Sequence, residues 1–177
     1  MSEAAQAGDK VAGGAEAPQT APPNTAPALF YHLTRSPREQ VAMMLLGRAL
    51  SQGWRVELRA DPAHGPLAQL DERLWHGAAA EFLPHGIAGG PQDAHQPILI
   101  TEAAPSPEAG RFDAVMAVAG AMVTPEDCAG RQRLWILFDG TDETALALAR
   151  RQWKTLTDAG IEGQYWSEAE GPWKRMR

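Results

Sequence analysis

The chain has 177 residues, of which 44% are hydrophobic, and carries a formal net charge of −6. This length predicts one domain with a substantial core, and the single cysteine excludes an internal disulfide and a zinc site built on thiolates. No apolar run has the length of a membrane span and the N-terminus lacks a signal-peptide core, so we expect a cytoplasmic protein. The acidic charge disfavours direct binding to duplex DNA, because that affinity comes from cations that neutralise phosphates.

Residues 1–27 are rich in alanine and proline and contain no aromatic residue. Because the segment has no periodic apolar face, it cannot bury enough surface to offset the entropy lost on ordering. We therefore predict a disordered tail over residues 1–27 and a single α/β domain over residues 28–177.

Strand-like and helix-like stretches alternate along the rest of the chain. Short apolar or alternating runs predict strands at residues 29–33, 54–58, 97–101, 114–118, 134–138 and, more weakly, 161–166. Periodicity and end signals predict helices over residues 37–52, from residue 67 onward and over 143–159, with a short helical turn after Thr124. This alternation predicts a three-layer α/β sandwich with a largely parallel central sheet.

Two stretches carry specific local signals. Ser36 precedes Pro37 and stands three residues before Glu39, a capping-box arrangement that predicts Ser36 as the N-cap of the first helix. Residues 54–58 read Trp-Arg-Val-Glu-Leu, and this alternation predicts a strand with one solvated face.

The stretch QLDERLWHGAAAEFLPHGIAGG, residues 69–90, begins as part of an amphipathic helix. Its apolar face combines residues at positions i, i+3 and i+7 with a neighbouring aromatic residue: Leu67, Leu70, Leu74 and Trp75. Phe82, Leu83 and Pro84 follow on a connection. An apolar segment there more often marks a contact surface than a core, although packing on a satellite core remains open.

The last predicted helix places Arg150 and Lys154 on one outer face, with Arg151 beside them and Trp153 at the boundary. One interpretation is a solvated helix whose late cations complement its dipole while Trp153 is buried. The other is capture of a terminal carboxylate beside an apolar side chain, with arginine as a fork, lysine as a charge and tryptophan as a wall. The residues alone slightly favour the first.

No stretch carries a recognisable catalytic motif. The first strand is followed by HLTRSPREQ rather than G-x-G-x-x-G, and no Gly-Lys-Ser/Thr phosphate loop occurs. Asp139 ends a hydrophobic strand, a common place for a catalytic acid, but a turn with Gly140 before a capped helix is the favoured interpretation. His85, His95 and Cys128 have no partners at the spacing of a metal site or nucleophile. We expect no catalytic residue, metal or cofactor; a nucleotide- or small-molecule-binding enzyme is the alternative, and a direct nucleic-acid binder the third possibility.

LDERLW followed by EFLPHGIAGG, with ALARRQWKTLTDAG at residues 147–160, resembles the chi subunit of bacterial DNA polymerase III, a clamp-loader accessory protein. The resemblance extends from about residue 30 to about residue 166. It implies a three-layer fold similar to nucleotide-binding domains. It also implies a non-catalytic adapter in DNA replication that links the clamp loader to single-stranded-DNA-binding protein and touches DNA only indirectly.

The resemblance also implies two partner sites. Chi proteins use the last helix to bind the acidic, phenylalanine-ended tail of the single-stranded-DNA-binding protein, which here implies Arg150, Trp153 and Lys154, with Arg151 in place of the acid seen in some members. A psi subunit or another clamp-loader subunit would dock at the other matched block: Trp75, Phe82, Leu83, Pro84 and His85.

Overall fold

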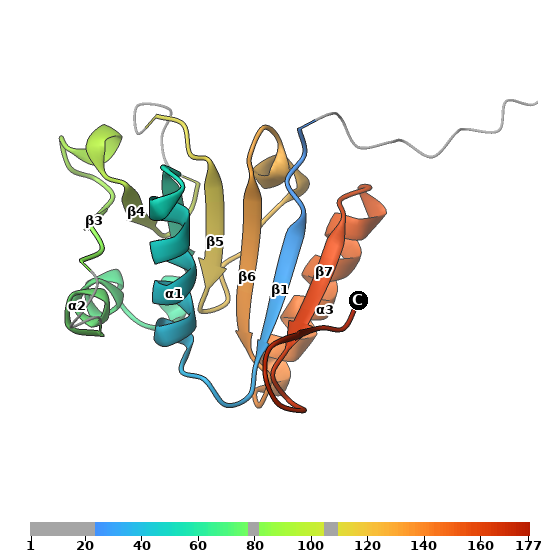
Figure 1. The fold of residues 1–177 in the computed structure, drawn as a ribbon. Coiled ribbons are helices and arrows are strands. Elements are labelled where there is room, and N and C mark those ends of the chain that lie inside the picture. The colour runs from blue at the N-terminus through green and yellow to red at the C-terminus, as the bar shows by residue number, and fades with distance from the viewer. Residues whose placement is uncertain (1–23, 78–81, 105–109) are drawn as a thin grey trace, which may run out of the picture.

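The computed structural model describes residues 24–77, 82–104 and 110–177. Within these residues, eight strands form one open, mostly parallel sheet in the order β3-β4-β2-β5-β6-β1-β7-β8. Helices lie on both faces of the sheet (Figure 1), so the predicted three-layer α/β fold is confirmed.

The strands are β1 (Ala28–Leu33), β2 (Val56–Ala60), β3 (His85–Ile87), β4 (Ile98–Thr101), β5 (Ala114–Val118), β6 (Arg133–Asp139), β7 (Gly163–Ser167) and β8 (Lys174–Arg175). The helices are α1 (Arg38–Ser51), α2 (Leu67–Gly77) and α3 (Glu143–Asp158), with short 3-10 turns η1 (Pro62–His64), η2 (Asp93–His95) and η4 (Pro125–Cys128). Two edge strands, β3 and β8, lie where the sequence predicts a loop and a polar end. Of the strand pairs, β7 with β8 is antiparallel and the others are parallel.

Two apolar clusters hold the three layers together. One face of the sheet is covered by α1 and α2, whose buried residues are mostly aliphatic and recur with the helical period. The opposite face is covered by η4 and by α3, which buries Ala149, Gln152 and Leu156. The β5 run is buried at all five positions, as predicted for a strand with helices on both sides. None of the helices in the described residues has the length and apolar character needed to cross a membrane.

The predicted N-cap of α1 is wrong. The helix begins after Pro37, which offers no capping side chain. The Ser36 hydroxyl instead donates a 2.6 Å hydrogen bond to Glu168 Oε2. A hydrogen bond to an ionised carboxylate is about twice as strong as one between neutral groups, so this distant partner takes the hydroxyl.

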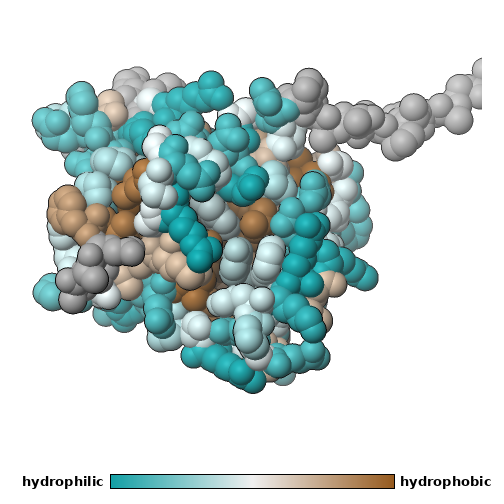
Figure 2. All heavy atoms as spheres, viewed as in Figure 1, coloured by the Kyte–Doolittle hydropathy of each residue, from teal (hydrophilic) through white to brown (hydrophobic). Residues whose placement is uncertain are grey.

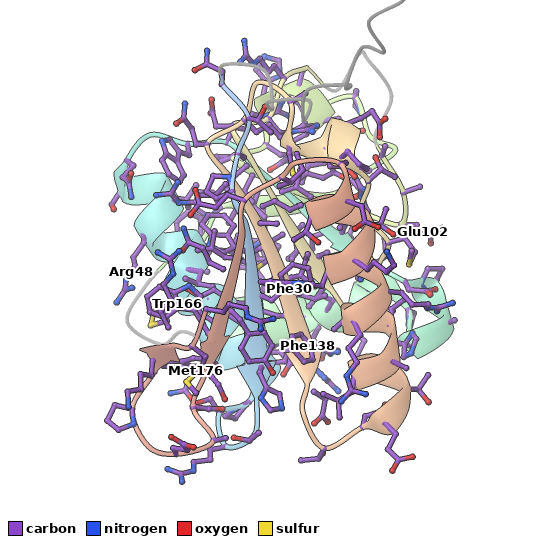
Figure 3. The ribbon with its side chains drawn as sticks, turned by 90° about the vertical axis from the view of Figure 1, so that its right-hand side faces the viewer. Phe30, Arg48, Glu102, Phe138, Trp166 and Met176 are labelled. Atoms are coloured by element: carbon purple, nitrogen blue, oxygen red, sulfur yellow. The ribbon has the colours of Figure 1, made fainter. Side chains whose placement is uncertain are left out.

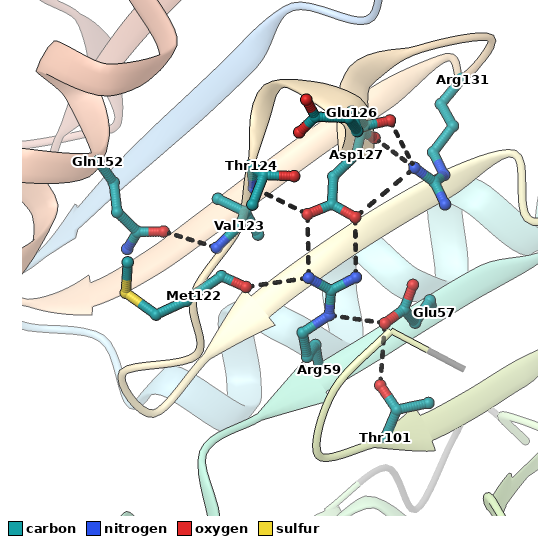
Figure 4. Close-up of polar contacts among 10 residues, drawn as sticks. All are labelled: Glu57, Arg59, Thr101, Met122, Val123, Thr124, Glu126, Asp127, Arg131 and Gln152. Atoms are coloured by element: carbon teal, nitrogen blue, oxygen red, sulfur yellow. Dashed lines mark hydrogen bonds and ion pairs between the residues drawn. The ribbon is translucent and has the colours of Figure 1, made fainter. Parts of the chain in front are cut away.

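The predicted solvated face of β2 is also wrong. All five residues of β2 are buried, including Glu57 at 0% exposure and Arg59 at 5%. Arg59 lies between two carboxylates, with Nε 2.7 Å from Glu57 Oε1 and Nη2 2.9 Å from Asp127 Oδ1 (Figure 4). Burial alone would raise the pKa of Asp127, but hydrogen bonds from Arg59 and the Thr124 amide outweigh it and hold that pKa below its usual value. The polar positions of β2 are therefore an internal ion network that ties the sheet to η4.

The last residues of the predicted tail contact the domain. Ala26 is 1% exposed and its amide donates to the Cys128 carbonyl at 2.9 Å, while the Gly130 amide donates to the Asn24 carbonyl at 2.9 Å. Thr25 forms an isolated bridge with Ala129. Residues 24–27 are thus attached to the turn after η4. Residues 1–23 lie outside the described residues, so a disordered tail there remains a prediction.

Removing residues 1–23 is expected to change the thermal midpoint of unfolding by less than about 2 °C, because that sequence has no apolar face to dock. The measurement is differential scanning calorimetry of the full chain and the shortened one. A second deletion that extends through Pro27 is the comparison, and it should lower the midpoint because it removes the contacts of Asn24 and Ala26. A drop of several degrees for the first deletion would show that the tail packs on the domain.

Candidate functional site

A cavity of about 370 Å³ lies between α3 and the strands that α3 covers. Its walls come from β1, β6, β7, α3 and the segment after β7: Phe30, Phe138, Leu146, Ala149, Arg150, Trp153, Tyr165, Met176 and Arg177. In Figure 3, Phe30 and Phe138 lie between α3 and the C-terminal strands, and Met176 lies on the segment that returns along β7. We call this cavity the α3 pocket.

Trp153 forms a large part of the apolar wall. Its ring packs edge-on against Phe30 with centroids 5.1 Å apart, and the Tyr165 ring lies 6.4 Å away. Gly163 permits this position, because a Cβ there would lie 2.8 Å from a Trp153 ring atom. The ring is half-buried, so Trp153 belongs to both the core and the pocket, and neither interpretation of this residue is complete by itself.

Arg150 is the cation of α3 that reaches the pocket. It is exposed and forms no ion pair with any described residue. Burial raises the pKa of Tyr165, and the positive charge of Arg150 offsets part of that rise. Lys154 Nζ instead pairs with Asp158 Oδ2 at 2.5 Å, and neither Lys154 nor Arg151 lines the cavity. The structure therefore brings together Arg150 and Trp153 and places the other two cations on the outer side of the helix.

A second surface is formed by exposed apolar side chains of α2, β3 and the residues before β3. Trp75 is 49% exposed and Phe82 76%, with ring centroids 5.8 Å apart, and Ile87 adds a side chain that is 39% exposed. Figure 2 shows apolar surface on this side of the molecule, at the left of the view. We call these three residues the α2 surface.

Leu83 and His85 do not belong to the exposed part of that surface. Leu83 is 4% exposed and packs in the core under α1 and α2. His85 is buried beneath Trp75, with Nδ1 2.6 Å from the Leu83 carbonyl oxygen and Nε2 3.4 Å from Asp71 Oδ1. Pro84 is half-buried between them. The structure thus separates two adjacent residues: Phe82 faces solvent and Leu83 faces the core. Whether Phe82 belongs to a contact surface stays a prediction.

The larger cavity, about 540 Å³, lies at the carboxyl ends of β1, β5 and β6. Adjacent strands β1 and β6 are followed by helices on opposite faces of the sheet, which is where α/β folds commonly bind nucleotides. Two of the three arginines in its lining are already paired, since Arg38 Nη2 and Arg73 Nη1 lie 2.9 and 2.8 Å from Glu39 Oε1. The third, Arg35, donates from Nη2 to the Ala169 carbonyl at 3.1 Å. The amides of the β1–α1 turn donate to Glu168. A phosphate group would have to displace the chain's own carboxylates from Arg38, Arg73 and these amides.

The remaining candidates for chemistry have structural partners. Asp139 Oδ1 accepts hydrogen bonds from the amide and hydroxyl of Thr141, both at 2.7 Å, as expected for a turn, and Asp142 caps α3. Burial raises the pKa of the Cys128 thiol to about 12, which suits a packing residue. Among the described residues no group of three His, Cys, Asp or Glu side chains is placed to hold a metal ion.

Comparison with known proteins supports one family. The family model described as DNA polymerase III chi subunit, HolC, matches residues 26–164, which is well over half of the chain. The match includes the α2 surface and the whole of α3, and it ends inside β7, before Tyr165, Met176 and Arg177. No curated protein matches the sequence.

Proposed function

This chain belongs to the family of DNA polymerase III chi subunits, and from that membership we propose that it is a non-catalytic adapter between the clamp loader and single-stranded-DNA-binding protein. Its place in DNA replication follows from the family. The partners, the residues that bind them, indirect association with DNA and a cytoplasmic location are parts of the proposal.

The observation that carries the proposal is the chemistry of the α3 pocket. An aromatic floor of Phe30, Phe138 and Trp153 lies beside Arg150, which has no ion-pair partner among the described residues. An acidic peptide that ends in phenylalanine offers an apolar ring for the floor and a carboxylate for a bidentate arginine contact. The pocket thus suits the tail of a single-stranded-DNA-binding protein better than it suits a nucleotide.

Arg151 and Lys154 contribute differently in this proposal. They lie outside the cavity on the exposed side of α3, where they raise the local positive potential that attracts an acidic peptide. Lys154 would have to exchange Asp158 for a peptide carboxylate. Because such exposed pairs are worth about 0.2–1 kcal/mol, the exchange costs little.

The α2 surface is the proposed contact with the clamp loader, through a psi subunit or another subunit. Trp75 and Phe82 supply two adjacent exposed rings, and aromatic side chains of this kind dominate the energy of many protein interfaces. Pro84 and the buried pair Leu83 and His85 hold the segment that presents Phe82.

Replacing Arg150 with glutamate is expected to weaken binding of the acidic tail peptide at least 10-fold, more than replacement with alanine, because it removes the fork and adds repulsion. Wild-type affinity should be micromolar, on the order of 8 kcal/mol, and should fall as salt rises. Isothermal titration calorimetry with the peptide, and with a copy lacking its last phenylalanine, gives both quantities.

Arg48→Glu is the matched control, since Arg48 is an exposed helical arginine on α1, away from the α3 pocket. This variant should bind like the wild type. Equal binding of both peptides by wild type and Arg150→Glu, or no binding by the wild type, would refute the site. Titration of a mononucleotide tests the enzyme alternative, and titration of a naked oligonucleotide tests the alternative of a direct nucleic-acid binder. The adapter proposal predicts that neither ligand binds.

A further inference from the structure

The segment Glu168–Arg177, which follows β7, contributes two lining residues of the α3 pocket, Met176 and Arg177. It lies beyond the residues that the family model matches. We call it the C-terminal strap. Figure 1 shows it turning at one end of the sheet and returning along β7. Its position is fixed at three places.

The first anchor is the carboxylate of Glu168, which is 5% exposed. Its Oε1 accepts hydrogen bonds from the amides of Thr34, Arg35 and Ser36 at 3.0, 2.8 and 2.8 Å, and its Oε2 accepts one from the Ser36 hydroxyl at 2.6 Å. Burial alone would raise the pKa of Glu168, but these four donors outweigh it and hold the pKa at about 2. The side chain is therefore a charged latch between the strap and the β1–α1 turn near neutral pH.

The second anchor is Trp173, whose ring lies edge-on to Tyr31 with centroids 5.1 Å apart. The third is β8 and the two residues after it, which extend the sheet antiparallel to β7. There the Met176 amide donates to the Tyr165 carbonyl at 2.7 Å, and the Tyr165 amide donates to the Arg177 carbonyl at 3.2 Å. The backbone of Met176 is thus fixed against the residue whose ring lines the pocket.

The side chains of the strap match the ligand chemistry of that pocket. Met176 lines the cavity with half of its surface exposed, 51%, so a ligand can cover it. A thioether packs well against an aromatic ring. Arg177 is a second basic residue of the lining beside Arg150, and none of the lining residues has an acidic side chain. A pocket with an apolar floor and two arginines favours a peptide that is acidic and ends in an aromatic residue.

We propose that the C-terminal strap is a specificity element of the α3 pocket, in which Met176 packs on the terminal aromatic side chain of the bound peptide and Arg177 binds its acidic residues. The inference rests on the proposed function, since it assumes the same peptide ligand. Glu168 acts as a positioning residue, because it holds the strap and does not touch the ligand.

The test is a comparison of two acidic peptides, one ending in phenylalanine and one ending in alanine, by isothermal titration calorimetry with the full chain. Met176→Ser is expected to raise the Kd of the phenylalanine-ended peptide about 5–10-fold and that of the alanine-ended peptide less than about 2-fold. Met122→Ser is the matched control, because Met122 is 56% exposed and does not line the pocket. It should leave both affinities unchanged.

Glu168→Ala tests the positioning role. It is expected to reduce discrimination between the phenylalanine-ended and alanine-ended peptides as much as Met176→Ser does. Circular dichroism checks that the domain remains folded. If the wild type binds the phenylalanine-ended peptide but Met176→Ser binds both peptides as the wild type does, or binds them more tightly, the strap is not a specificity element and the proposed function stands. If the wild type binds neither peptide, the proposed function itself fails, and this inference fails with it.

Discussion

Replacing Arg59 with alanine is expected to remove about 3–5 kcal/mol of unfolding free energy, because it leaves the buried Glu57 without a counterion and Asp127 with only the more distant Arg131, at 3.7 Å. Arg59 donates to Glu57 Oε1 at 2.7 Å, to Asp127 Oδ2 and Oδ1 at 3.0 and 2.9 Å, and to the Met122 carbonyl at 2.9 Å. Glu57 is completely buried, so bulk solvent does not stabilise its charge. A loss of this size is a large share of the stability of an ordinary domain.

Urea denaturation of the wild type and the variant measures the loss, and Arg48→Ala, at an exposed arginine, should change stability by less than about 0.5 kcal/mol.

The same network predicts that the folded protein loses stability in acid. The pKa of Asp127 is lowered in the folded state, so its contribution is present above the unfolded value of about 3.9 and is lost as the pH falls below it. In the urea experiment, a loss of less than about 1 kcal/mol of unfolding free energy for Arg59→Ala would mean that the network is solvated.

Phe82→Ser and Leu83→Ser are expected to impair different properties although the residues are adjacent: the first should impair partner binding and the second stability. Leu83→Ser should cost about 3–5 kcal/mol of unfolding free energy, because it leaves a cavity and a hydroxyl in the core. Phe82→Ser should change stability by less than about 0.5 kcal/mol, since its ring is 76% exposed, but should abolish association with the clamp loader.

Thermal unfolding and co-purification with the clamp loader separate the two effects. Met122→Ser, at another exposed apolar residue, should leave both stability and association unchanged. If Phe82→Ser binds the clamp loader as the wild type does, the α2 surface is not the contact.

Most strands and helices could be predicted from local patterns, because each one buries a row of apolar side chains whose spacing is set by its own backbone. The runs at β5 and β6 and the periodicity of α3 are examples, and they fixed the fold class. Contacts between distant residues were not accessible in this way. Glu57 looks like part of a solvated strand face because the network that buries it includes Asp127, which binds Arg59 from 68 positions away. Ser36 looks like an N-cap because Glu168 is 132 positions away.

The candidate site was predicted in part for the same reason. Arg150 and Trp153 lie on one helix, so their spacing places them together. Phe30, Phe138 and Met176 come from β1, β6 and the C-terminal strap, and only the sheet order brings them to the same cavity. Aromatic residues in two predicted strands were visible in the sequence, but no local pattern says that these strands are neighbours.

The position of β1 in the sheet has a consequence for folding during synthesis on the ribosome. Within the described residues its partners are β6 and β7, and β6 begins at Arg133, 100 positions after Leu33 at the end of β1. At a synthesis rate of about 5–20 residues per second, β1 waits roughly 5–20 s with its backbone unpaired. The strands β2, β4 and β5 can meanwhile assemble on one another. The first strand of the described residues is therefore among the last to be docked, and until then its apolar sequence, ALFYHL, is exposed to non-native contacts.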